Sequence, residues 1–361
     1  MVRRDGRASV RGAPYSRPVS IEPGDALRRI AYLLERERAG TYRVRAFRGA
    51  AETVGRTAHE ELVSRAAAGT LSELPGIGSA TEAVVREALA GEVPTYLSTL
   101  EDRAAEPLVR GGEAVRAALR GDLHCHSNWS DGGSPIEEMV MSAIELGHSY
   151  LTLTDHSPRL KVANGLTAVR LTKQLGVIEG LNTALDGSGF RLLRGIEVDI
   201  LDDGSLDQTP EMLAQLDVVV ASVHSKLRME PAAMTRRMVA AVSNPRTNVL
   251  GHCTGRMVEG ERGTRAQSTF DAPAVFAACL AGDVAVEINS RPERRDPPDD
   301  LLQLAIEMGC RFSIDSDAHA PGQLDFVAYG CARAEALGVP LERIVNTWER
   351  ERLLEWARPA A

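Results

Sequence analysis

The chain has 361 residues, of which 43% are hydrophobic and 25% charged, with a formal net charge of −8. These proportions are typical of a soluble globular protein, and no apolar run approaches the ~20 residues that a membrane span requires. The five cysteines have no CxxC spacing and nothing near the start resembles a secretory signal, so we expect a reduced, cytoplasmic setting.

The first 120 residues are predicted to be helical after a disordered tail at residues 1–20. Apolar residues recur at helical spacing in 22–38, and further helical stretches follow at 42–54, at 60–67 and up to Leu89. We assign residues 21–100 to a small all-α domain and residues 101–119 to a helical connector.

Residues 120–361 are predicted to form one larger domain. From Gly121 onward, short apolar strands alternate with helical segments, which is typical of βα units around a parallel sheet or barrel. In the first of these helices, Ser134, Pro135 and Glu137 match an N-cap, the first helical position and a capping box. The fold class is therefore α/β.

Six of the eight histidines lie at the ends of predicted strands, often beside carboxylates. Only His59 and His148 lie elsewhere. Asp131 follows in the loop after the first pair, Glu197 ends another apolar run, and Asp317 precedes the last histidine. The six are His124, His126, His156, His224, His252 and His319.

Strand geometry favours a shared metal site over six separate hydrogen-bonded residues. Positions i and i+2 of a strand face the same side, so His124 can chelate with His126, and Asp317 with His319. Nitrogen and oxygen donors suit zinc, manganese or iron. Strand neighbours point the opposite way, so the adjacent Cys125 and Cys253 are interpreted as wall residues.

A glycine turn between two predicted helices is the second informative element. The run Leu74-Pro75-Gly76-Ile77-Gly78 would place bare backbone amides at a helix N-terminus, where they can hold a DNA phosphate. A plain interhelical turn is the alternative reading. On the first reading, Gly76, Ile77 and Gly78 contact DNA.

The chain resembles the PHP (polymerase and histidinol phosphatase) family, and within it the PHP domain of bacterial family-X DNA polymerases. The N-terminal resemblance rests on residues 42–47 and 74–78. The PHP motifs are Gly121–Ser127, Ser130–Gly132, Leu153–Leu160, Ala163–Leu166, Gly195–Leu201, Asp203–Asp207, Ala221–Ser225, Leu250–His252, Glu287–Asn289, Asp317–His319 and Tyr329–Gly330.

The resemblance implies a distorted (β/α)7, TIM-like barrel with a trinuclear metal site at the carboxyl ends of its strands, preceded by a small helix-hairpin-helix domain. The family's ligand positions map onto His124, His126, Asp131, His156, Glu197, His224, His252, Asp317 and His319. We therefore expect two or three divalent ions per chain.

Two departures from the family pattern stand out. The helical domain runs into the barrel through the short connector at residues 101–119, which leaves no room for the polymerase palm, so the chain is not expected to polymerise DNA. Cys253 stands where the family usually has proline, which puts an oxidisable thiol beside His252.

The predicted activity is metal-dependent hydrolysis of DNA phosphate esters, as a 3′–5′ exonuclease or 3′-end processing enzyme in repair. Lys226 and Arg159 are candidates for steadying a phosphate. One alternative is a small-molecule phosphomonoesterase resembling histidinol-phosphate phosphatase, with a small phosphate ester as substrate. A non-catalytic DNA-binding protein is the other.

Overall fold

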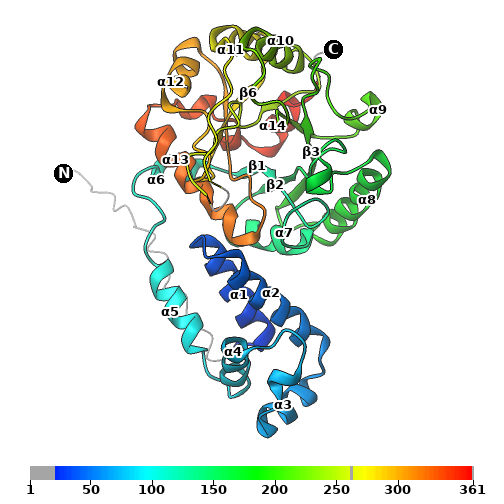
Figure 1. The fold of residues 1–361 in the computed structure, drawn as a ribbon, viewed down its shortest axis with the longest axis vertical. Helices are drawn as coiled ribbons and strands as arrows, with labels where there is room; N and C mark the ends of the chain where they lie inside the picture. Colours follow the sequence, from blue (N-terminus) through cyan, green and yellow to red (C-terminus); the bar gives the residue numbers. More distant parts are fainter. Residues whose placement is uncertain (1–20, 261–262, 360–361) are drawn as a thin grey trace, which may run out of the picture. The chain divides into compact units, whose positions relative to one another are not determined.

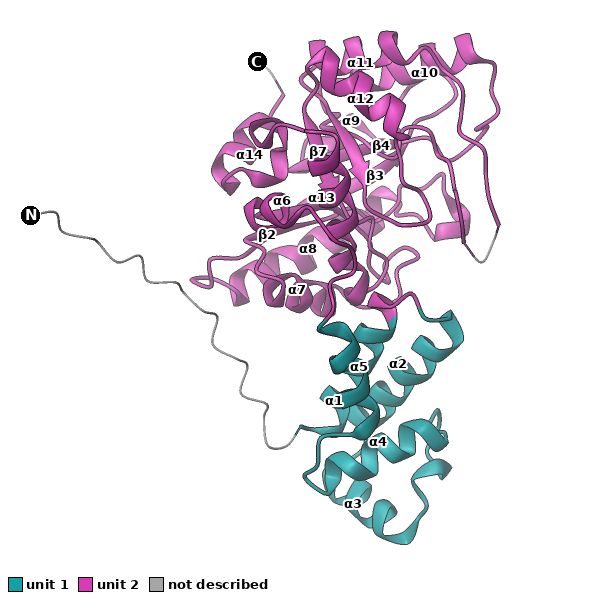
Figure 2. Ribbon diagram, turned by 90° about the vertical axis from the view of Figure 1, so that its left-hand side faces the viewer, with its two compact units in different colours: residues 1–34, 39–105 teal, residues 35–38, 106–361 magenta. Residues whose placement is uncertain are grey.

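The computed structural model describes residues 21–260 and 263–359, so the tail predicted at residues 1–20 lies outside it. The described chain divides into two compact units (Figure 1). Residues 21–34 and 39–105 form unit 1, and residues 35–38 and 106–359 form unit 2, as coloured in Figure 2. No described helix combines the length and apolar composition needed to cross a bilayer.

Unit 1 is entirely helical, as the periodicity predicts. Its helix α1 packs Leu27, Ile30 and Leu34 into a core shared with Phe47 of α2 and Val85 of α4. The predicted boundary at residue 100 falls inside α5, and the compact unit continues to residue 105. The elements are α1 Pro23–Arg36, α2 Thr41–Arg56, α3 His59–Ala68, the 3₁₀ turn η1 Leu71–Glu73, α4 Ser79–Leu89 and α5 Thr95–Ala104.

Unit 2 contains a nearly closed barrel of seven parallel strands, which confirms the predicted fold. The strands pair in chain order, and a parallel bridge between Cys125 and Ala318 joins the last segment to the first. They are β1 Gly121–Cys125, β2 Tyr150–Leu153, β3 Arg191–Asp199, β4 Val218–Ser222, β5 Val249–Leu250, β6 Ala285–Asn289 and β7 Phe312–Asp315.

Helices surround these strands, as the outer coils of Figure 1 show. Both faces of the strands are buried, apart from Arg191 and Arg194 in β3, which explains the nearly continuous apolar runs in the sequence. The helices are α6 Glu113–Ala118, α7 Ile136–Glu145, α8 Ala168–Ala184, α9 Pro210–Leu213, α10 Pro231–Val242, α11 Ala272–Ala281, α12 Asp299–Met308, α13 Val327–Ala336 and α14 Arg350–Trp356, with 3₁₀ turns η2 Lys161–Ala163, η3 Pro321–Phe326, η4 Leu341–Arg343 and η5 Val345–Thr347.

One buried amide ties the first and last strands together. The Asn346 side chain donates to the carbonyls of Gly121 in β1 (3.2 Å) and Ile314 in β7 (3.0 Å). Its oxygen accepts the Ile314 N–H at 2.8 Å. Without these bonds, the backbone groups of Gly121 and Ile314 that face the gap between β1 and β7 would lack hydrogen-bond partners.

The predicted capping box of α7 is wrong. The helix begins at Ile136 with Pro135 at the N-cap, and no side-chain cap bond forms. The Ser134 hydroxyl is buried without a hydrogen-bond partner, while the Ser134 carbonyl accepts the N–H of Asn128 at 2.9 Å. This backbone bond holds Ser134 in the loop before α7, and the helix begins one residue later than the capping pattern predicts.

Outside the barrel's carboxyl end, His148 generates a prediction about stability. Burial and the Arg116 guanidinium lower the pKa of His148 to about 4. Since an unfolded histidine titrates near 6.5, the unfolded chain binds the proton first as the pH falls. Stability is therefore unaffected above about pH 6.5 and lost progressively towards pH 4, by about 2 kcal/mol at pH 5.

We expect His148→Gln to lose less free energy of unfolding than the wild type between pH 7 and pH 5. Urea titrations at the two pH values measure this difference. Replacing the exposed His59 in the same way is the control. Equal losses for wild type and His148→Gln would contradict the prediction.

Candidate metal centre

The nine predicted ligands converge at the carboxyl end of the barrel, where the ends of parallel strands meet. His124 and Glu197 lie in strands β1 and β3. The other seven lie in the segments just beyond strands, namely His126, Asp131, His156, His224, His252, Asp317 and His319.

The Glu197 carboxylate lies at the middle of this group and is buried. Five imidazoles surround it, contributed by segments around β1, β2, β4 and β5. Its Oε2 lies 2.8 Å from His156 Nδ1, 3.4 Å from His124 Nε2 and 3.6 Å from His126 Nε2, and its Oε1 lies 2.8 Å from His252 Nε2 and 3.2 Å from His224 Nε2.

Most of these close approaches are not hydrogen bonds. Glu197 Oε2, His124 Nε2 and both ring nitrogens of His126 and His224 are buried, with no hydrogen-bond partner among the described residues. Orphaned polar atoms of this kind are costly in a protein interior. Donor atoms about 3 Å apart without hydrogen-bond geometry are what a shared ion with bonds of about 2.1 Å requires. The residues therefore fit a metal.

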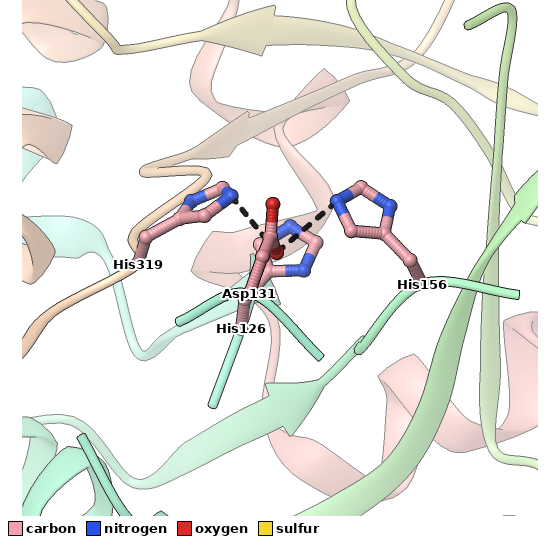
Figure 3. A group of neighbouring side chains, drawn as sticks. All are labelled: His126, Asp131, His156 and His319. Carbon is pink, nitrogen blue, oxygen red and sulfur yellow. Dashed lines mark ion pairs between the residues drawn. The ribbon is translucent and has the colours of Figure 1, made fainter. Parts of the chain in front are cut away.

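A second set of ligands shares His126 and His156 with the surroundings of Glu197. Figure 3 shows this set, which consists of His126, Asp131, His156 and His319. Asp131 Oδ1 lies 3.5 Å from both His156 Nε2 and His319 Nε2, along the two dashed lines. The His126 ring packs between the other two imidazoles, with centroid distances of 4.4 Å to His156 and 4.3 Å to His319. The Asp131 side chain is 35% exposed, so this set lies on the solvent side of the cluster.

Three overlapping groups of side chains can each hold one ion. In each group, the donor atoms lie within 4.8 Å of one another. His126, His156 and Glu197 each belong to two groups, so ions bound there would share ligands. The groups are His126, Asp131, His156 and His319; His124, His126 and Glu197; and His156, Glu197 and His224.

The electrostatics favour the ligand-competent forms at His126 and Glu197. At His124 and His224, carboxylates outweigh the opposing effect of burial: Glu287 and Glu197 raise the pKa of His124 well above its usual value, and Glu197 and Asp199 raise that of His224 to about 9. Burial lowers the pKa of His126 well below its usual value, and the neighbouring His319 and His156 lower it further. Burial alone would raise the pKa of Glu197, but His224, His124 and His156 hold it well below its usual value. A neutral imidazole and an ionised carboxylate are the forms that bind a cation.

Glu287 orients two of the ligands, His124 and His252. In the sequence, Glu287 was placed in a family motif but was assigned no role. Its Oε1 lies 2.5 Å from His124 Nδ1, and its Oε2 accepts the His252 N–H. Such a contact fixes which nitrogen of His124 faces the metals. Asn289 donates to both Glu287 and Asp317, at 3.1 Å each.

Two arginines beside Asp317 were missed by the sequence reasoning. Arg294 Nε donates to Asp317 Oδ2 at 3.0 Å, and Arg291 Nη1 lies 3.0 Å from His319 Nδ1. Arg294 and Arg291 help to hold the pKa of the buried Asp317 well below its usual range, against the opposing effect of burial. In the sequence, a cluster of arginines directly after the Glu287–Asn289 motif could have indicated them. The chain is rich in arginine elsewhere, so this cluster did not stand out.

Lys226 and Arg159 lie outside the three ligand groups. Lys226 is exposed and forms an ion pair with Asp202. Arg159 is also exposed, and its backbone N–H donates to Asp207. In the sequence, Lys226 follows the ligand His224 by two residues and Arg159 follows the ligand His156 by three.

The thiols of Cys125 and Cys253 take no part in the ligand groups among the described residues. Cys125 Sγ donates to the carbonyl of Thr152 at 3.3 Å, and Cys253 Sγ lies 3.8 Å from Asp296 Oδ1. Burial raises the pKa of both thiols well above the usual value, which disfavours the thiolate form that binds metals.

The predicted DNA-contacting turn lies in unit 1, between η1 and α4. Gly76 has φ +77°, which favours glycine, while Gly78 is extended and caps α4. Ile77 is buried in the core of unit 1, so of the three residues its side chain is the least accessible. The Gly78 N–H is bound to Thr81 Oγ1 at 2.9 Å.

A parallel barrel that gathers imidazoles and carboxylates at its carboxyl end defines a barrel metalloprotein. Residues 122–291 match the family model of the PHP domain, so the barrel of unit 2 contains a PHP domain. Together with relatives named as probable phosphatases, this match indicates a phosphoester-hydrolysing enzyme.

Two relatives differ in how much of their own length the alignment with this chain covers. The chain is 36% identical over 255 residues to "DNA polymerase/3'-5' exonuclease PolX" of Bacillus subtilis, which covers 71% of the chain but 42% of that protein. It is 28% identical over 250 residues to a "Probable phosphatase" of Caldicellulosiruptor saccharolyticus, covering 66% of the chain and 96% of the relative. The chain thus spans less than half of the Bacillus protein.

Among solved structures, the histidinol phosphate phosphatase of Lactococcus lactis, complexed with zinc, L-histidinol and phosphate, is similar at 19% identity with a TM-score of 0.44. The similarity covers 61% of this chain and 92% of that one.

The ligand geometry predicts that His126→Ala lowers the metal content of the purified protein by at least one ion per chain. His126 belongs to two ligand groups, so its loss weakens both. Elemental analysis of the wild type should find two or three transition-metal ions. The exposed His59→Ala is the matched control, with unchanged metal content. Wild-type protein that binds no transition metal would contradict the prediction.

Proposed function

We propose that this chain is a metal-dependent phosphoesterase that hydrolyses DNA phosphate esters, as a 3′–5′ exonuclease or 3′-end processing enzyme in repair. The observation that carries the proposal is the set of buried, unpartnered imidazole and carboxylate atoms around Glu197. The nine ligands His124, His126, Asp131, His156, Glu197, His224, His252, Asp317 and His319 would hold two or three ions of manganese, zinc or iron.

Bound divalent ions make a nucleophilic hydroxide available near pH 7 and polarise phosphoryl oxygens. The protein's own part is to hold the substrate phosphate. We assign this task to Arg294 and Arg291, because both guanidinium groups lie beside the ligands Asp317 and His319. For the two Nη atoms of Arg294, no hydrogen bond is recorded within the described ranges, which leaves them for a phosphate.

Arg159 and Lys226 are assigned a more distant role. Exposed cations in loops around a phosphoesterase centre attract a polyanion, even where they touch no reacting atom. Lys226 already has Asp202 as a partner, so its contribution is partly offset.

The DNA assignment rests on unit 1 and on the Bacillus relative, whose name includes a 3′–5′ exonuclease. Helix geometry leaves the amides of Ser79 and Ala80 without intrahelical acceptors at the start of α4. Together with the helix dipole, these amides suit a DNA phosphate.

One observation favours a small phosphate ester instead. The aligned region covers 96% of the Caldicellulosiruptor protein, which is named a probable phosphatase. A protein of that length thus carries the name without a domain like unit 1. This alternative leaves unit 1 without a task.

A direct comparison of substrates tests the proposal. The manganese-loaded chain should shorten 5′-labelled single-stranded and gapped DNA faster than it releases phosphate from histidinol phosphate. His126→Ala should lower both rates by at least about a hundredfold, because it removes a shared ligand. Faster turnover of histidinol phosphate, with intact DNA, would decide for the alternative.

The glycine turn gives a prediction that separates DNA binding from hydrolysis. A Cβ at Gly78 would meet nothing within 4 Å, and the backbone there is extended, so Gly78→Leu should fold normally. The added side chain should keep a phosphate from the amides of α4 and weaken DNA binding about tenfold. Fluorescence anisotropy with labelled DNA at fixed salt measures the effect.

Gly55→Leu is the matched control, since Gly55 of α2 also faces open space. Hydrolysis of p-nitrophenyl phosphate should be unchanged in both variants. Unaltered DNA binding by Gly78→Leu would contradict the role of the turn, and so would a parallel loss of both activities with the fold intact.

A further inference from the structure

A short loop leaves the metal centre directly after His156 and ends in an exposed apolar tip. Val162 is 95% exposed, whereas the next residue, Ala163, is buried. Arg159 and Lys161 are exposed beside it, and no ion pair is recorded for Lys161 in the part of the chain that the structure describes. A lone exposed valine is common on protein surfaces. A function for Val162 therefore depends on the rigidity and the position of its loop.

The loop is rigidly closed at its base. The Leu166 N–H donates to the carbonyl of His156 at 2.7 Å, and the Gly165 N–H donates to Leu160 at 3.2 Å. A Cβ at Gly165 would lie 1.8 Å from the carbonyl oxygen of Ser157, so the two arms of the loop meet at a point that only glycine allows. The tip is therefore held in place relative to the ligand His156.

A second set of bonds fixes the loop to the solvent side of the centre. Asn164 Nδ2 donates to the carbonyl of Trp129 at 3.2 Å, and Arg170 donates to the same carbonyl. Trp129 lies two residues before Asp131, the partly exposed ligand. The loop thus borders the solvent-exposed side of the centre, where Asp131 lies.

We propose that residues 159–164 form a wedge for a nucleic-acid end, in which Val162 packs against the terminal base while Lys161 and Arg159 contact the backbone phosphates. The inference rests on the proposed function and specifies its substrate as a strand whose last base pair is opened on binding. Apolar side chains inserted at a base step unstack it, and nearby phosphate contacts offset the cost. A small phosphate ester offers no base for such a tip.

The test follows base unstacking without relying on cleavage. The probe is a blunt DNA duplex with 2-aminopurine in its terminal pair and phosphorothioate linkages that resist hydrolysis. Binding of the full, metal-loaded chain should raise the 2-aminopurine fluorescence, because the base leaves the stack. Val162→Ser should reduce this rise about fivefold through the loss of one apolar contact. The exposed position of Val162 makes the variant harmless to the fold.

Leu280→Ser is the matched control, because Leu280 is a half-exposed apolar residue on α11 and should leave the rise unchanged. Binding of single-stranded DNA and hydrolysis of p-nitrophenyl phosphate should be the same in all three proteins. An absent rise, or an equal rise with Val162→Ser, overturns the wedge.

The outcome for the wedge is separate from that for the proposed function. DNA shortening without a fluorescence rise would keep the exonuclease and remove the wedge. A rise that depends on Val162, in a chain that does not hydrolyse unmodified DNA, would keep the wedge and remove the exonuclease.

Discussion

The burial of one carboxylate among imidazoles is the constraint on which the rest of the centre depends. Glu197 is nearly inaccessible to solvent, and such a charge is costly unless it is paired. Imidazoles approach both of its oxygens, yet Oε2 has no hydrogen-bond partner within the described structure. Divalent cations held there would satisfy the carboxylate and the imidazole lone pairs together. Folding of unit 2 is therefore expected to be linked to metal binding.

Two of the converging ligands, just beyond the strand ends, have an unusual backbone conformation. Asp317 has φ +51° and His252 has φ +20°, values that non-glycine residues rarely adopt. Surrounding groups hold both residues in place: Asn289 and Arg294 bind the Asp317 carboxylate, and Glu287 accepts the His252 N–H. The residues behind the ligands thus determine where the donor atoms point as much as the strands do.

The metal ligands by themselves do not distinguish a DNA end from a small phosphate ester, since both present the same phosphoryl group. Features outside the ligand set carry that distinction. In unit 1 the turn before α4 presents free amides, and in unit 2 the loop beyond His156 presents Val162. Each can be altered without touching the metal centre, so binding and hydrolysis can be measured separately.

Local patterns were sufficient for the helices of unit 1, the parallel strands of unit 2 and the choice of candidate ligands. Amphipathic spacing, apolar runs and the selective placement of histidine are all properties of short segments. Strand alternation, however, was the wrong reason for pairing Asp317 with His319, because β7 ends at Asp315 and both residues lie in the following loop.

Other features depended on contacts between distant segments, and only the tertiary structure decided them. Arg294 reaches Asp317 from another loop, Asn346 joins β1 to β7, and Asn164 fixes the loop that carries Val162 to the carbonyl of Trp129. A sequence specifies which side chains are available at each position. Which of them are buried, unpartnered or brought together is determined by long-range packing, which no local periodicity encodes.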